Sequence, residues 1–254
     1  MLGERKESGS FVYVDEGKGH PLVLLHGLMG GLSNFDAVLS YFVENGYRVI
    51  LPEMPMYSMP LLKTNIKSLS NFLEDFLSHM QLDKVTLIGN SLGGHVSLVY
   101  TKNYGHRVHS LCLTGSSGLY ESAMGDSFPR RGDYEYIRKK TEEVFFNKEV
   151  ATKELVDEVF ESVNDRNKVL RTISFSKSAI RHNMSADLAE FKLPVCLIWG
   201  KNDGVTQPHV AEKFHELLPD SELNWIDQCG HAAMMERPVE FNRILHDFLK
   251  RRVS

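Results

Sequence analysis

Residues 85–100, VTLIGNSLGGHVSLVY, decide the fold. The stretch starts with an apolar run typical of a strand buried on both faces of a sheet, and it ends with a segment that favours a helix. Between them, residues 89–93 fit the pattern G-x-S-x-G, in the strand–turn–helix setting that exposes a nucleophile at a sheet edge. Glycines are needed because larger side chains beside so tight a turn would clash. The stretch therefore predicts Ser91 as a nucleophile at a helix N-terminus, where the helix dipole favours negative charge. A glycine-rich turn with an incidental serine is the alternative, which the flanking strand and helix disfavour.

Strand-like and helix-like segments alternate on both sides of that turn. The apolar runs are PLVLLHG, GYRVILPEMP, VHSLCLTG, PVCLIWG and SELNWID, which begin at residues 21, 46, 108, 194 and 221. In residues 68–82 the apolar side chains recur at helical spacing, which indicates an amphipathic helix. This alternation predicts an α/β fold with a mostly parallel central sheet flanked by helices.

Residues 119–187 interrupt the alternation. They contain no strand-like apolar run and hold charged segments with helical periodicity instead, such as YEYIRKKTEEVFF and KELVDEVFESV. No linker rich in proline, glycine or serine separates them from their neighbours. We therefore expect a helical cap inserted into one α/β core, which comprises residues 1–118 and 188–254. In such folds an inserted layer covers the carboxyl edge of the strands, where ligands bind.

The composition is that of an ordinary globular protein. The 254 residues are 42% hydrophobic and 24% charged, with a formal net charge of −4 and no long basic run, so nothing indicates nucleic acid as a partner. Cys112, Cys196 and Cys229 show no close pairing and no metal-ligand spacing, so we expect buried reduced thiols, no metal and no cofactor. A polar N-terminus and the lack of a membrane-spanning apolar run indicate a cytoplasmic protein. A homodimer is left open.

The serine hydroxyl needs a base, and the base needs an acid to orient it. His231 follows the predicted strand SELNWID, at the sheet edge where catalytic groups collect. Asp203 follows the strand VCLIWG, which gives the chain order Ser, Asp, His that hydrolases with such a turn show. We expect His231 to act as general base and Asp203 to hold its tautomer. A turn-shaping role for Asp203 and the rival acid Asp227 are less favoured, because Asp227 lies too close in sequence to the histidine loop.

Two backbone N–H groups are expected to bind the oxyanion that forms during acyl transfer. One belongs to Leu92, directly after the nucleophile, and the other to Leu28 in the loop HGLMGG. The glycines of this loop let its backbone approach a substrate closely. We expect His26, the first residue of the loop, to brace it by hydrogen bonding.

Methionines gather in the loops that should surround the site. Methionine is flexible and polarizable and suits an adaptable apolar pocket, whereas ordinary core filling is the alternative. Two further methionines, Met124 and Met184, fall in the predicted cap. The methionines expected to contact the substrate are Met29, Met54, Met56 and Met234.

The HGLMGG loop, the GNSLGG turn, the WGKND acid turn and the CGHAAMMERP histidine loop together resemble the serine hydrolase branch of the α/β-hydrolase superfamily. The likeness spans nearly the whole chain outside the cap. It implies the α/β-hydrolase fold and supports the triad of Ser91, Asp203 and His231. Haloalkane dehalogenases and epoxide hydrolases of this superfamily place aspartate where this chain has Ser91.

Within the superfamily, the Asn90–Ser91 pair and the ending MERPVEFNRILHDFL resemble the meta-cleavage-product C–C hydrolases, and Asn90 is therefore counted among the candidate substrate-binding residues. Two positions depart from that pattern. Those enzymes typically carry a tryptophan after the histidine, where this chain has Ala232, and Val159 aligns approximately with their cap arginine. Arg181 would replace that arginine only if the cap folds differently.

We therefore expect a carboxylesterase-like serine hydrolase that cleaves an ester or similar acyl bond of a small, largely apolar substrate through an acyl-enzyme. C–C bond hydrolysis of a vinylogous diketone acid is the second hypothesis. A small-molecule receptor that keeps the triad but turns over slowly is the third. Analogy of fold does not choose among the three, because function resides in the site.

Overall fold

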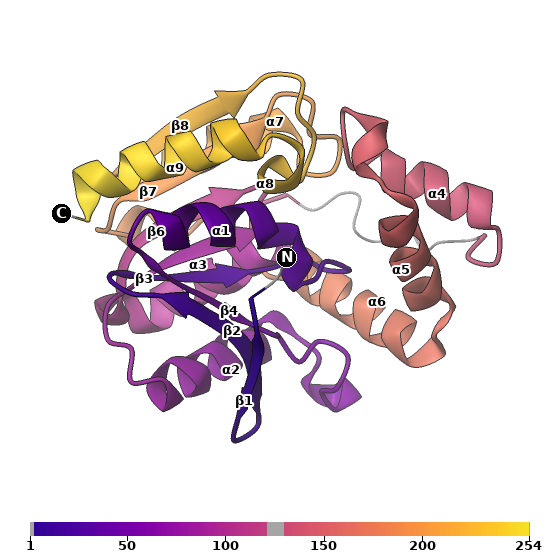
Figure 1. The fold of residues 1–254 in the computed structure, drawn as a ribbon, viewed down its shortest axis with the longest axis horizontal. Coiled ribbons are helices and arrows are strands. Elements are labelled where there is room, and N and C mark those ends of the chain that lie inside the picture. Colours follow the sequence, from indigo (N-terminus) through magenta and orange to yellow (C-terminus); the bar gives the residue numbers. More distant parts are fainter. Residues whose placement is uncertain (1–2, 121–129, 254) are drawn as a thin grey trace.

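A central sheet runs through the computed structural model, which describes residues 3–120 and 130–253 (Figure 1). Its strands are β1 Arg5–Ser8, β2 Phe11–Gly17, β3 Pro21–Leu25, β4 Arg48–Pro52, β5 Val85–Asn90, β6 Val108–Thr114, β7 Val195–Gly200 and β8 Ser221–Ile226. They are ordered β1-β2-β4-β3-β5-β6-β7-β8. β1 pairs with β2 and β2 with β4 in antiparallel fashion, and the remaining pairs are parallel. The predicted α/β fold with a mostly parallel sheet is confirmed.

Both faces of the sheet are buried because its central strands are continuous apolar runs. Every residue of β5 and of β7 is buried. Successive side chains of a strand point to opposite faces, so Val23 and Leu25 of β3 join one core cluster while Leu22 and Leu24 join the other. The three cysteines are buried in the second of these clusters, and each is free.

Helices cover the two faces and complete the core. Their bounds are α1 Asp36–Glu44, α2 Ile66–His79, α3 Leu92–Tyr104, α7 Pro208–Leu217, α8 Ala233–Glu236 and α9 Pro238–Arg252. Helices α2, α3 and α7 contribute to the first cluster, and α1, α8 and α9 contribute to the second (Figure 1). Short 3₁₀ helices lie in the connections: η1 Leu32–Phe35, η2 Leu61–Lys63, η3 Gly105–Arg107, η4 Lys148–Val150 and η5 Leu188–Glu190. None of the helices in the described ranges is long and apolar enough to cross a membrane.

The connection from β6 to β7 carries further helices, α4 Tyr134–Glu142, α5 Lys153–Asn164 and α6 Arg166–Arg181. Each begins at a side chain that accepts a backbone hydrogen bond, namely Asp133, Thr152 and Asp165. In Figure 1 they form a separate layer at the right of the sheet. This layer corresponds to the expected helical insertion, whose limits at residues 119 and 187 stay a prediction. Met124 lies outside the described residues.

Candidate active site

Ser91 occupies a strained turn between β5 and α3. Its backbone φ of 53° and ψ of −118° lie in a region that side-chain-bearing residues rarely adopt, which costs on the order of 1–3 kcal/mol. The turn is possible only with glycines around it. A Cβ on Gly93 would lie 2.1 Å from the carbonyl oxygen of Leu25, and one on Gly89 would lie 2.5 Å from Cα of Gly94. The local sequence thus fixes the turn, and the turn places Ser91 at the carboxyl edge of the sheet.

Backbone hydrogen bonds hold this strained residue in place. The N–H of Ser91 donates to the carbonyl of Thr114 at 3.1 Å, and the carbonyl of Ser91 accepts from the N–H of Ser117 at 3.1 Å and of His95 at 3.2 Å. Strain of this kind persists only where the surroundings over-determine it, and it concentrates at functional sites. Ser91 is 8% exposed and lines the pocket described below.

His231 and Asp203 come from the loops after β8 and β7 and meet in a hydrogen bond. Nδ1 of His231 lies 2.9 Å from Oδ2 and 3.2 Å from Oδ1 of Asp203. The Asp203 carboxylate is buried, and its Oδ1 also accepts from the N–H groups of Val205 and Thr206, both at 2.8 Å. The N–H of His231 donates to the carbonyl of Val144 at 2.8 Å. These bonds orient the imidazole so that Nδ1 faces the carboxylate and Nε2 lies on the opposite side of the ring.

Asp227 does not take part in this arrangement. Its side chain is 77% exposed and forms an ion pair with Lys201 at 2.7 Å. The geometry therefore favours Asp203 as the partner of the histidine, as expected from the separate strands that carry the two residues.

Two supporting residues were missed by sequence reasoning or given another role. Gly115 has φ +52°, and a Cβ there would lie 2.7 Å from Nδ1 of His231, so the glycine makes room for the imidazole. In the sequence, the one feature that pointed to Gly115 was its position at the end of the apolar run VHSLCLTG. Asn90 donates through Nδ2 to the carbonyls of Thr114, at 3.1 Å, and of His231, at 3.3 Å. Asn90 lines the pocket as well, and it ties the histidine loop to the sheet.

The two expected oxyanion donors lie on elements that flank Ser91. Leu28 lies in a tight turn in which the N–H of Gly30 donates to the carbonyl of Gly27 at 3.2 Å, and Leu92 is the first residue of α3. Within the described residues, neither the Leu28 nor the Leu92 N–H donates to a protein acceptor. Both remain available to a ligand, and their role as oxyanion donors stays a prediction.

His26 braces the same loop. Its Nδ1 lies 3.0 Å from the carbonyl of Gly27, and the ring is buried. Burial lowers the pKa of His26, so the ring stays neutral near neutral pH and can donate from Nδ1. The bond agrees with the expected bracing role.

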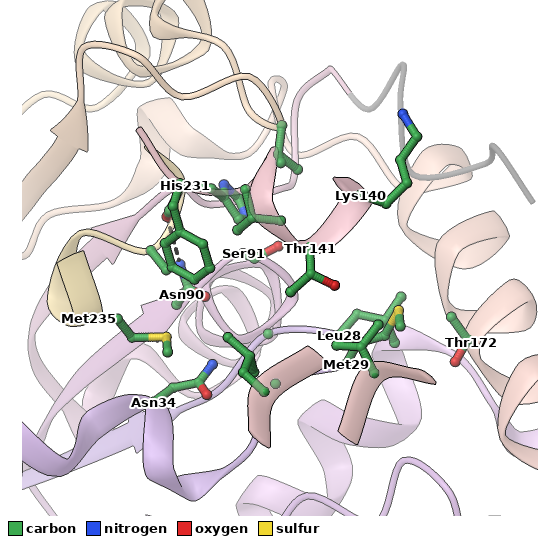
Figure 2. Close-up of a pocket in the computed structure, with 18 of the residues that line it drawn as sticks. Leu28, Met29, Asn34, Asn90, Ser91, Lys140, Thr141, Thr172, His231 and Met235 are labelled. Carbon is green, nitrogen blue, oxygen red and sulfur yellow. Dashed lines mark hydrogen bonds between the residues drawn. The ribbon is translucent and has the colours of Figure 1, made fainter. Parts of the chain in front are cut away.

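A pocket of about 260 Å³ lies between the sheet edge and the cap. Figure 2 shows Ser91, Asn90 and His231 together on the side formed by the sheet edge. Apolar side chains of the core and the cap make up most of the remaining wall: Leu28, Met29, Met235, Phe145, Leu155 and Val159. Such a lining favours an apolar ligand with few polar groups.

Lys140 on α4 is the one lysine or arginine among the described residues that line this pocket. Its ammonium points away from Ser91 in Figure 2 and pairs with Glu143 at 2.7 Å. Arg181 does not line the pocket; it is exposed, and its Nε donates to the carbonyl of Lys177 at 3.1 Å. Val159 does line it.

The structure revises the expectation for the methionines. Met29 lines the pocket and adopts φ +62°, whereas Met54 and Met56 pack into the first core cluster and Met234 packs into the second. These three side chains are at most 4% exposed and do not line the pocket, so core filling accounts for them. Met235, next to Met234, faces the pocket instead.

Comparison with known proteins agrees with this fold. Residues 20–238 match the family described as alpha/beta hydrolase fold, and the chain belongs to that family. Its family and its named relatives identify this protein as a hydrolase.

Two curated relatives cover nearly all of the chain. It is 28% identical to a 2-hydroxy-6-oxo-6-phenylhexa-2,4-dienoate hydrolase from Comamonas testosteroni, over 99% of this chain and 95% of the relative. It is 30% identical to a 2-hydroxy-6-oxononadienedioate/2-hydroxy-6-oxononatrienedioate hydrolase from Paraburkholderia phymatum, over 93% and 90%. Among solved structures, MGS-MChE2, an alpha/beta hydrolase enzyme from the metagenome of lagoon sediments of Mar Chica, Morocco, is 49% identical with a TM-score of 0.82, over 99% of this chain and 100% of that one.

Proposed function

We propose that this protein is a serine hydrolase that cleaves an ester or similar acyl bond of a small, largely apolar substrate. One observation carries the proposal. The strained Ser91 and an imidazole anchored to a buried carboxylate line the same apolar pocket. A serine in a G-x-S-x-G turn, a histidine and an aspartate in this chain order are the components of acyl transfer in such hydrolases.

In the proposed reaction, Nε2 of His231 accepts the proton of Ser91 as Oγ attacks the acyl carbon. Asp203 keeps the proton of His231 on Nδ1 and stabilises the imidazolium that forms. The N–H groups of Leu28 and Leu92 bind the oxyanion. The imidazolium then protonates the leaving group, and an acyl-enzyme remains on Ser91. A water molecule, activated by the same imidazole, releases the acid.

C–C bond hydrolysis of a dienoic keto-acid is the second candidate, favoured by the activities for which the two curated relatives are named. Such a substrate carries a carboxylate, which needs a cation or strong hydrogen-bond donors. Lys140 is the one lysine or arginine among the described pocket residues, and its ammonium points away from Ser91. Val159 and Ala232 are apolar where the C–C hydrolases typically carry arginine and tryptophan. We therefore rank ester hydrolysis first.

The test compares p-nitrophenyl acetate, butyrate and hexanoate with a 2-hydroxy-6-oxo-dienoate. Wild type, Ser91→Ala and Arg181→Ala are assayed in parallel. Ester hydrolysis that exceeds keto-acid cleavage, is lost in Ser91→Ala and persists in Arg181→Ala supports the proposal. Keto-acid cleavage that exceeds ester hydrolysis and is lost in Ser91→Ala replaces it with the second candidate. Stoichiometric binding without turnover on either class makes the protein a receptor.

A further inference from the structure

Helix α6 presents two different faces. Its inner face carries Phe175, which is fully buried, and Thr172 and Ser176, which line the pocket. On its outer face three aliphatic side chains are exposed: Leu170 by 42%, Ile173 by 37% and Ile180 by 43%. Their spacing of three and seven residues keeps them on one side of the helix. The wall of the pocket thus has an apolar stripe on its outside.

The 3₁₀ helix η2, which packs beside α6, also exposes large apolar side chains. Leu61 is 47% exposed and Leu62 is 98% exposed, the largest value among the exposed large apolar residues described. The segment is tied to α6, because Nε of Arg171 donates to the carbonyl of Met59 at 2.9 Å. Two neighbouring elements therefore expose leucine and isoleucine side chains to water, and such surfaces mark sites of interaction.

Positive charge accompanies the apolar side chains. Helix α6 contains five basic residues and no acidic one, although the chain as a whole has a net charge of −4. Arg166, Lys177 and Arg181 are exposed, as are Lys63 and Lys67 beside η2. None of these five forms an ion pair with a carboxylate in the part of the chain that the structure describes.

The positive charge of α6 and η2 limits which partners could cover this surface. A symmetric dimer would place the same surface against itself and would bring the two sets of cations together. A partner must therefore be anionic and must also accept aliphatic side chains. The interface of an anionic bilayer has both properties, and basic amphipathic helices lie in it with their aliphatic residues among the acyl chains.

We propose that the outer face of α6 together with η2, the α6–η2 face, docks this protein on the surface of anionic phospholipid membranes. The face consists of Leu61, Leu62, Lys63, Leu170, Ile173, Lys177, Ile180 and Arg181. Because the inner side of α6 lines the pocket, docking brings the pocket wall to the layer in which apolar esters dissolve. Binding itself needs no turnover, so the proposal does not rest on the proposed function.

The test is co-sedimentation with vesicles of phosphatidylcholine alone or of phosphatidylcholine with phosphatidylglycerol. We expect binding only to the vesicles that contain phosphatidylglycerol, and weaker binding as salt is raised. Each cation near an anionic surface contributes about fivefold to the partition coefficient, so Lys177→Gln/Arg181→Gln should lower it about 25-fold. The control pair Lys18→Gln/Lys250→Gln removes two exposed cations from other parts of the surface and should leave it unchanged.

A second variant separates the apolar contribution from the charge. Leu62→Ser alters a side chain with almost no contacts, so it cannot unfold the chain, and it should weaken vesicle binding at every salt concentration. Equal binding of the two vesicle types, or equal loss in both charge pairs, would overturn the proposal. So would a dimer in sedimentation velocity that Leu62→Ser dissociates, because a second copy would then cover the face.

Discussion

The sheet edge and the cap contribute to the same pocket, but different interactions hold their residues in place. At the edge, Ser91, Asp203 and His231 are at most 8% exposed, and backbone hydrogen bonds hold each of them. In the cap, charged side chains pair with neighbours on their own helix, as in Arg138 with Glu135 and Lys153 with Asp157. Such exposed pairs contribute little to stability. The edge therefore fixes the position of reacting groups, whereas the cap supplies an apolar surface that tolerates change.

The largest effect should follow from Ser91→Ala at the edge. Loss of a triad member typically costs about 10⁴–10⁶ in kcat. The fold should persist, because the glycines and backbone bonds shape the turn and the hydroxyl does not. Ester turnover and circular dichroism measure the two parts of this prediction. Activity above about a tenth of wild type would remove Ser91 from the proposed mechanism.

Asp203→Asn should come next. Asparagine keeps the shape of the side chain but not its charge, and it favours the wrong tautomer of His231, for which a drop of about 10⁴ in kcat is expected. Asp227→Asn is the matched control, since that carboxylate is exposed and pairs with Lys201. The comparison of the two kcat values decides which aspartate acts. A larger loss in the Asp227 variant would reverse our assignment.

A third prediction concerns His95, which joins the two regions. Its Nε2 lies 3.1 Å from Nδ1 of His182, at the end of α6, and its Nδ1 lies 3.4 Å from Oγ of Ser117. Burial, and next the nearby His182, lowers the pKa of His95 to about 3. The unfolded chain therefore binds a proton below about pH 6.5 that the folded chain does not bind until about pH 3. The free energy of unfolding should fall as the pH drops between these values.

Denaturant titrations at pH 7 and pH 5 measure this effect. The contribution of His95 to the difference in unfolding free energy between these pH values is about 2 kcal/mol. His95→Gln should remove that part of the difference, while the wild type keeps it. An identical difference in both proteins would show that His95 is not the group responsible.

The smallest effect is expected in the cap. Leu155 and Val159 line the pocket, and each methylene of a substrate that they bury adds about 0.8 kcal/mol, or about fourfold in kcat/KM. Leu155→Ala should therefore lower the ratio of kcat/KM for hexanoate over acetate esters several-fold. Leu170→Ala removes a leucine from the exposed face of α6 and should leave that ratio unchanged. An unchanged ratio in Leu155→Ala would place the acyl group elsewhere.

The sequence predicted the edge better than the cap because the edge depends on local patterns. The turn at Ser91 and the loops of Asp203 and His231 follow continuous apolar strands, and such strands are readable from a short stretch. Their parallel order brings their carboxyl ends to one edge of the sheet. The fold was therefore predictable from the sequence, and the loops of the candidate triad were placed on the correct edge.

Side-chain direction in the loops was not predictable. Met234 and Met235 are adjacent, yet one is core and the other lines the pocket. Both lie on the short helix α8, and which of them faces the core depends on how α8 packs against α1 and α9, which no local pattern encodes. The bond from Asn90 to the carbonyl of His231 joins residues 141 positions apart, and only the folded chain reveals it.

Mass spectrometry of the protein after reaction with a fluorophosphonate is the sharpest test of whether Ser91 carries the acyl group. We expect one adduct per chain, located on the peptide that contains Ser91 and absent in Ser91→Ala. Ser116 and Ser117 are buried serines close to the turn, and they should stay unmodified. An adduct on either of them, or ester hydrolysis that continues in a protein fully modified at Ser91, would rule out Ser91 as the nucleophile.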